Sequence, residues 1–181
     1  MLPTGDPPQN KRPTETESEG LGKYIPSKWT GKKTGVAILT SDKTDFKTKA
    51  IKRDIEGHFI ILKGRLHKES INIINIYAHN IGALKYVRKV LEGLKKDIHS
   101  NTFILGDFNT SLSTMDKSSK ENINKDIAAL NNVLDQMDLT DIYKTFHPKE
   151  AKYTFFSNAH GTFSKIDHMK GHKQASTNSR N

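Results

Sequence analysis

The chain reads Thr102-Phe103-Ile104-Leu105-Gly106-Asp107-Phe108-Asn109 near its middle. Its first four residues form an apolar run bounded by glycine, which is typical of a buried β-strand. Residues i and i+2 of an extended segment point the same way, so we expect Asp107 and Asn109 to face one cleft while Phe108 turns into the core. A carboxylate can accept a proton from water and an amide can orient that water, which suits hydrolysis. The alternative is a loop in which Asp107 and Asn109 hydrogen-bond their own backbone.

Two other polar segments follow or lie within apolar runs. In Asn75-Ile76-Tyr77-Ala78-His79-Asn80, the hydroxyl of Tyr77 can donate to a phosphate, although a strand tyrosine more often packs in the core or at its rim. In Ser164-Lys165-Ile166-Asp167-His168, two consecutive strand residues point to opposite faces. Asp167 is therefore not expected to orient His168, and any histidine that it orients lies elsewhere.

Apolar periodicity predicts the elements around these motifs. Strands are expected at residues 36–39, 59–66, 71–78, 102–105, 153–157 and 163–169. Residues 66–70 form a hairpin-length connection, which predicts an antiparallel pair. Apolar residues from Leu84 to Ile98 recur at helical spacing. A second helix is expected from Ser118, where Ser118 and Glu121 have capping-box spacing, over about 18 residues. The order predicts an α+β fold with helices on predominantly antiparallel sheets.

Composition limits the kinds of protein that the chain can be. It has 181 residues, a net charge of +9 and no cysteine, which fits one domain and excludes disulfides, thiolate metal sites and a cysteine nucleophile. The lack of cysteine favours an intracellular location, and the sequence has no apolar run long enough to span a membrane. Residues 1–22 carry −2, so residues 23–181 carry +11. Such a basic body suits a nucleic acid, with solubility as the alternative explanation.

The two ends of the chain differ from its centre. Residues 1–22 are rich in proline and poor in large apolar residues, so we expect a disordered segment. Residues 170–181 are polar, so we expect a frayed tail. The folding unit is expected at residues 23–169.

Together these motifs resemble the endonuclease/exonuclease/phosphatase superfamily, and most closely the endonuclease domain of long-interspersed-element (LINE-1-type) retrotransposon proteins. The resemblance runs from about residue 23 to about residue 173 and rests on the order and spacing of several segments. Besides the motifs quoted above, they include Thr34-Gly35-Val36-Ala37-Ile38-Leu39, Asp141-Ile142-Tyr143 and Tyr153-Thr154-Phe155-Phe156-Ser157.

The resemblance implies a four-layer, DNase I-like fold, in which a two-sheet β-sandwich is flanked by helices. It also implies a magnesium-dependent phosphodiesterase that nicks one DNA strand. By the same resemblance, Asp107 positions or deprotonates the attacking water, Asn109 holds that water and a phosphate oxygen, Tyr77 contacts the scissile phosphate, and Asp167 orients a catalytic histidine. The positions that match DNA contacts are Asn80 and Thr154, together with Ser157, Thr162 and Ser164 in a hairpin that reads the minor groove.

The chain also departs from the family pattern. That pattern includes a catalytic Asn and a metal-ligating Glu before residue 35 and a terminal Ser-Asp-His, and the sequence has no match to them. We therefore expect an incomplete fold truncated at both ends, with impaired nicking and with metal-binding residues left unidentified. The alternative is a noncatalytic nucleic-acid-binding remnant. The expected partner is DNA, in the nucleus if the chain acts on genomic DNA, and the sequence predicts no oligomeric state.

Overall fold

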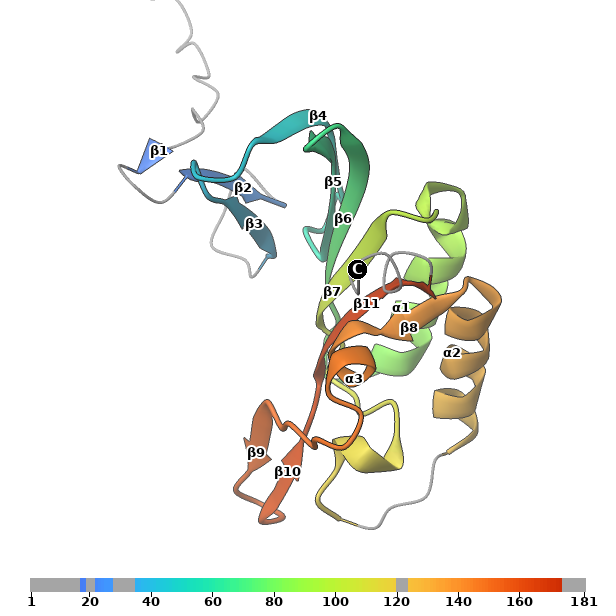
Figure 1. The fold of residues 1–181 in the computed structure, drawn as a ribbon. Coiled ribbons are helices and arrows are strands. Elements are labelled where there is room, and N and C mark those ends of the chain that lie inside the picture. Colours follow the sequence, from blue (N-terminus) through green and yellow to red (C-terminus); the bar gives the residue numbers. More distant parts are fainter. Residues whose placement is uncertain (1–16, 19–21, 28–34, 120–123, 174–181) are drawn as a thin grey trace, which may run out of the picture.

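The computed structural model describes residues 17–18, 22–27, 35–119 and 124–173 (Figure 1). Its largest element is a six-stranded sheet with the strand order β4-β5-β6-β7-β11-β8. The strands are β4 Phe46–Arg53, β5 Phe59–Leu66, β6 Glu69–Tyr77, β7 Thr102–Asp107, β8 Leu139–Asp141 and β11 Asp167–His172. All neighbours are antiparallel except β6 and β7, which are parallel because helix α1, Ala83–Gly93, connects them. The expectation of predominantly antiparallel pairing is confirmed.

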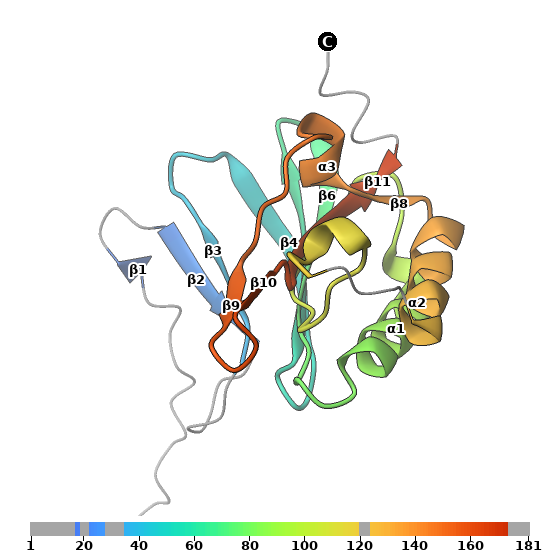
Figure 2. The ribbon, with the colours of Figure 1, turned by 90° about the horizontal axis from the view of Figure 1, so that it is seen from below.

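A smaller sheet packs against one face of the large one. It contains β1 Glu17–Ser18, β2 Gly22–Pro26 and β3 Ala37–Thr40 in antiparallel order. Ile25 and Ile38 of this sheet form a buried cluster with Ile60 and Leu62 of β5. Figure 2 shows the two sheets beside each other. The predicted α+β sandwich is thus confirmed, with three described strands in its smaller sheet.

Two helices cover the opposite face of the large sheet (Figure 2). Ile61 of β5 points to this side, while its neighbours Ile60 and Leu62 point to the small sheet. The hydrophobic core on this side of the sheet contains Ile61 together with Val87 of α1 and Leu130 of α2, Lys125–Gln136. All three side chains are fully buried. Each contributes roughly 1.5–3 kcal/mol of burial free energy. The apolar residues whose spacing predicted the first helix pack in or against this core.

The predicted hairpin at residues 66–70 is present. Strands β5 and β6 are antiparallel, and Leu66 pairs with Glu69 across a two-residue turn. Both turn residues, His67 and Lys68, have positive φ angles of 49° and 82°. A turn of this kind follows the right-handed twist of the two strands, so it also fixes their register.

Three predicted elements have the wrong bounds. The first helix, expected from Leu84 to Ile98, ends at Gly93 and is followed by a separate 3-10 helix at Lys95–Asp97. The second helix begins at Lys125 after the cap residue Asn124, whose side chain accepts a hydrogen bond from the backbone N–H of Ile127. Ser118 instead accepts a hydrogen bond from the backbone N–H of Phe163, so it caps no helix. Glu121 lies outside the described residues.

The strand predicted at residues 163–169 is divided in two. Its first part belongs to β10, Thr162–Ser164, which pairs with β9, Phe155–Ser157, in a separate hairpin. Its second part begins β11 at Asp167. The strand breaks because the backbone N–H of Lys165 turns away to donate to the carbonyl of Asp116.

Further elements had no counterpart among the predicted ones: β1, β2, β4, β8 and the short helix α3, Ile142–Phe146. Most of the segment predicted to be disordered, residues 1–22, lies outside the described residues, but Glu17–Ser18 pairs with Gly22 and Lys23 as a strand. Lys170 and His172, which were expected in the frayed tail, lie in β11, and residues 174–181 lie outside the described residues. None of the described helices has both the length and the apolar character needed to cross a membrane.

Candidate active site

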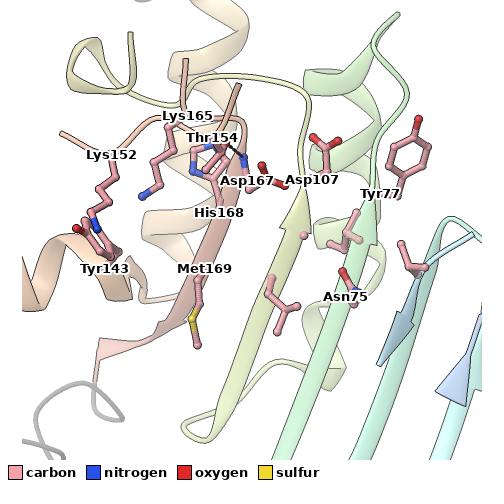
Figure 3. A pocket seen from close by; sticks show the side chains of 14 residues that line it. Asn75, Tyr77, Asp107, Tyr143, Lys152, Thr154, Lys165, Asp167, His168 and Met169 are labelled. Carbon is pink, nitrogen blue, oxygen red and sulfur yellow. Dashed lines mark hydrogen bonds between the residues drawn. The ribbon is translucent and has the colours of Figure 1, made fainter. Parts of the chain in front are cut away.

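Three residues that the sequence singled out lie side by side in the large sheet. Tyr77 at the end of β6 is the register partner of Asp107 at the end of β7, and Asp107 is the register partner of Asp167 at the start of β11. All three line a cleft of about 650 Å³ (Figure 3). Strands that are distant in sequence therefore bring one phenol and two carboxylates to the same end of the sheet, where β6 and β7 end and β11 begins.

The glycine before Asp107 fixes the position of this acid. Gly106 has a φ angle of 138°, and a Cβ atom built on it would lie 1.9 Å from the carbonyl oxygen of Ile76. Glycine is the residue that tolerates both this φ and this close approach of β7 to β6. The strand can therefore deliver Asp107 beside Tyr77.

Asp107 is half-buried and lies close to a second acid. Burial raises the pKa of its carboxyl, a hydrogen bond from the backbone N–H of Asn109 (2.8 Å) opposes that rise, and the charge of Asp167 adds to it. The net effect is a raised pKa. A carboxylate with a raised pKa is a stronger base towards water than an ordinary Asp.

Asn109 does not follow the extended geometry that we expected. Its φ angle of 49° places it in the left-handed region, and its side-chain amide donates to the carbonyl oxygen of Ala78 at 2.7 Å. Its backbone N–H caps the carboxylate of Asp107, so the local hydrogen bonding that was the alternative interpretation is present. Phe108 between them is fully buried, as expected.

Asn109 instead lines a second groove of about 520 Å³. Four of the five residues expected to contact DNA line the same groove: Asn80, Ser157, Thr162 and Ser164. The groove thus lies between the loop after β6, the loop after β7 and the β9–β10 hairpin. The structure therefore brings together four of the five positions at which the resemblance places DNA contacts.

Thr154, the fifth of these residues, lies in the first cleft with Asp167. Its hydroxyl oxygen accepts hydrogen bonds from the backbone N–H groups of Ile166 (3.1 Å) and Asp167 (3.2 Å, Figure 3). Thr154 therefore holds the backbone that presents the second carboxylate.

His168 lies on the other side of its strand from Asp167, as expected for consecutive strand residues. It is buried, its ring packs 5.3 Å from the ring of Phe108, and its Nε2 atom lies 2.8 Å from the carbonyl oxygen of Thr110. Burial lowers its pKa to about 4. His168 is therefore a neutral, packed side chain near neutral pH.

Three further residues line the cleft and had no role expected from the sequence: Tyr143, Lys152 and Lys165. The Nζ atom of Lys165 lies 3.2 Å from the carboxylate of Asp141 and 5.2 Å from the ring centroid of Tyr143. Burial alone would raise the pKa of Asp141, but Lys170 and Lys165 lower it to about 2. Lys152 and Lys165 follow no periodic pattern in the sequence, so their place in the cleft could not be predicted from it. Only the Asp141-Ile142-Tyr143 segment indicated this wall of the cleft.

The residues that the structure describes do not complete a magnesium site. Magnesium prefers near-octahedral oxygen coordination, to which Asp107 and Asp167 could contribute carboxylates. Within residues 17–18, 22–27, 35–119 and 124–173, however, no three His, Asp or Glu side chains are arranged to hold an ion together.

Several solved structures have a fold similar to that of this chain. The endonuclease domain of TRAS1, a telomere-specific non-LTR retrotransposon, matches with a TM-score of 0.61 and 13% identity over 83% of this chain and 66% of that domain. An AP endonuclease from Archaeoglobus fulgidus matches with a TM-score of 0.60 and 17% identity, again over 83% and 66%. The chain has the DNase I-like fold.

A third structure with the DNase I-like fold, D. rerio TDP2 complexed with a single-strand DNA product, matches with a TM-score of 0.57 and 12% identity over 83% of this chain and 62% of TDP2. The chain thus spans just under two thirds of the length of these structures. No protein-family profile matches it.

Proposed function

We propose that the chain is a DNA endonuclease domain of retrotransposon origin, which binds duplex DNA in the nucleus and whose nicking of one strand is too impaired to relax plasmid above background. The observation that carries this proposal is the row of Tyr77, Asp107 and Asp167 in one cleft. The similarity in fold to TRAS1, whose source is a retrotransposon, supports it.

The cleft residues suit hydrolysis of a phosphodiester. Asp107 accepts a proton from water, and the water oxygen attacks phosphorus while the bond to the leaving alkoxide breaks. The hydroxyl of Tyr77 donates a hydrogen bond to a phosphate oxygen. In the family that the chain resembles, magnesium stabilises the leaving oxygen, and an incomplete metal site would leave that charge largely uncompensated.

The second groove suits contacts to the DNA backbone and bases. Its polar residues from the β9–β10 hairpin, Ser157, Thr162 and Ser164, carry hydroxyl donors and acceptors. Such groups can contact both phosphates and base edges. The basic body of the protein adds sequence-independent affinity.

A noncatalytic DNA-binding domain is the second candidate function. It is favoured by the absence of a three-ligand metal group in the described part of the chain and by the burial of His168, which turns its ring away from Asp167. Binding would then rest on the groove and on net charge, with no hydrolysis.

Relaxation of supercoiled plasmid in magnesium, measured beside duplex binding, tests these proposals. We expect the chain to bind DNA and to give no relaxation above background. If the parent relaxes plasmid and Asp107→Ala does not, hydrolysis is intact and the impairment is refuted. If neither protein binds DNA, the proposal of DNA as the substrate fails.

A further inference from the structure

Two histidines meet at one end of strands β5 and β6, beside Tyr77 but not among the residues that line the cleft. His58 directly precedes β5, and His79 follows the end of β6. Their Nε2 atoms lie 3.2 Å apart, and their ring centroids lie 4.9 Å apart. The backbone N–H of Tyr77 donates to the carbonyl oxygen of His58 at 2.7 Å, so the pairing of the two strands holds the imidazoles together.

Acidic side chains face the other nitrogen of His58. Its Nδ1 atom lies 3.3 Å from a carboxylate oxygen of Glu56 and 4.0 Å from one of Asp54. Asp54 also accepts a hydrogen bond from the backbone N–H of His58 at 3.0 Å. A proton on Nδ1 is therefore directed at carboxylates, which leaves the lone pair of Nε2 directed at His79.

Tyr86 of α1 closes the back of this arrangement. Its ring contacts the ring of His58 edge to face, with centroids 5.7 Å apart. Burial raises the pKa of Tyr86 to about 12, and the charges of Asp54 and Glu56 contribute to the rise. The surroundings of His58 are thus negatively charged, and packing against Tyr86 fixes the orientation of its ring.

We propose that His58 and His79 bind one zinc-like transition-metal cation through their Nε2 atoms. Two nitrogen ligands at about 2.0–2.1 Å in tetrahedral geometry lie about 3.3 Å from each other, which is close to the spacing of this pair. A histidine that binds metal commonly donates its other N–H to a carboxylate, and Glu56 is placed to accept that bond.

The composition of the site sets its selectivity. Imidazole nitrogens suit zinc, copper and nickel, whereas magnesium prefers oxygen ligands. No third His, Asp or Glu of the described residues joins the pair around one point, so water fills the remaining positions. His79 is exposed, which gives the ion a direct path to the site. The site does not depend on the proposed nuclease activity.

Calorimetric titration of the purified chain with Zn²⁺ in excess Mg²⁺ tests the proposal. We expect one ion per chain at the tightest site, and we expect His79→Gln to weaken this binding by about tenfold or more. His147→Gln is the matched control, because His147 also has a carboxylate neighbour, Glu150 at 3.4 Å, but is not part of the pair. This control should bind as the parent does.

Nuclear magnetic resonance of the imidazole nitrogens in the parent protein gives a readout that does not depend on a variant. Zn²⁺ should shift the Nε2 resonances of His58 and His79 together, at one equivalent. Equal affinity of His79→Gln and the parent, displacement of Zn²⁺ by Mg²⁺, or unshifted Nε2 resonances would each overturn the proposal.

Discussion

Gly106 is the residue on which the placement of Asp107 depends. A side chain at this position would collide with the carbonyl oxygen of Ile76 in the neighbouring strand, and the φ angle of 138° would be strained as well. We expect Gly106→Ala to lower the free energy of unfolding by at least about 2 kcal/mol. Chemical denaturation measures this change. Gly93→Ala is the control, because open space surrounds Gly93, and an equal loss in both variants would contradict the argument.

His168 links the stability of the protein to pH. Burial lowers its pKa to about 4, so the unfolded chain binds a proton that the folded chain rejects between pH about 6.5 and about 4. The contribution of His168 is therefore fully present above this window and is lost as the pH falls through it. We expect His168→Gln, which cannot titrate, to show a smaller loss of stability across the window, by up to about 3 kcal/mol.

Thermal unfolding at several pH values checks this expectation. His147→Gln is a suitable comparison, because His147 is exposed in the loop after α3. If His168→Gln and the parent lose stability in parallel from pH about 6.5 to about 4, burial of a neutral His168 does not govern acid sensitivity.

In the proposed DNA complex, the β9–β10 hairpin is the element that we expect to distinguish DNA sequences. Ser164 and Thr162 line the groove, and contacts to base edges specify sequence whereas contacts to phosphates position the protein. We expect Ser164→Ala to reduce the ratio of affinities between the best-bound and the worst-bound duplex by a few-fold. The average affinity over all duplexes should change less. Fluorescence anisotropy with a panel of duplexes measures both quantities.

Ser100→Ala, in the exposed turn before β7, should leave this preference unchanged. If Ser164→Ala instead weakens every duplex equally, the hairpin positions DNA and does not read it.

Elements with an uninterrupted apolar pattern could be predicted from the sequence, whereas others could not. The bounds of β5 agree at both ends, because its buried residues form one continuous run. Strand β4 was missed because a bulge between Thr48 and Ala50 interrupts its alternation. The start of α2 was wrong because Asn124, and not Ser118, supplies the cap.

The residues of the candidate site could be predicted from the sequence, but their arrangement could not. Asp107, Tyr77 and Asp167 were each recognised at the end or start of an apolar run, and the family resemblance grouped them. Their shared register, however, depends on which strands are neighbours, and local periodicity does not encode the pairing of β11 with β7. Asn109 was misplaced because its left-handed φ angle is set by hydrogen bonds to Ala78 and Asp107.

The net charge of the molecule determines how the proposed DNA binding is expected to respond to salt. The chain carries a net charge of +9, and each phosphate that a cation neutralises releases counterions. We expect duplex affinity to fall by about tenfold or more between about 50 mM and about 200 mM salt. Anisotropy titrations across this range measure the slope, and a flat response would refute electrostatic binding.

The cleft of Tyr77, Asp107 and Asp167 and the adjoining groove form the proposed DNA-binding surface. Titration of the ¹⁵N-labelled chain with a short duplex, followed by amide chemical shifts, tests this assignment. We predict that the perturbed amides cluster at Gly106, Asp107, Asp167 and the β9–β10 hairpin. Perturbations confined to the outer face of α1 or to the exposed lysines of β4, with the cleft unchanged, would contradict it.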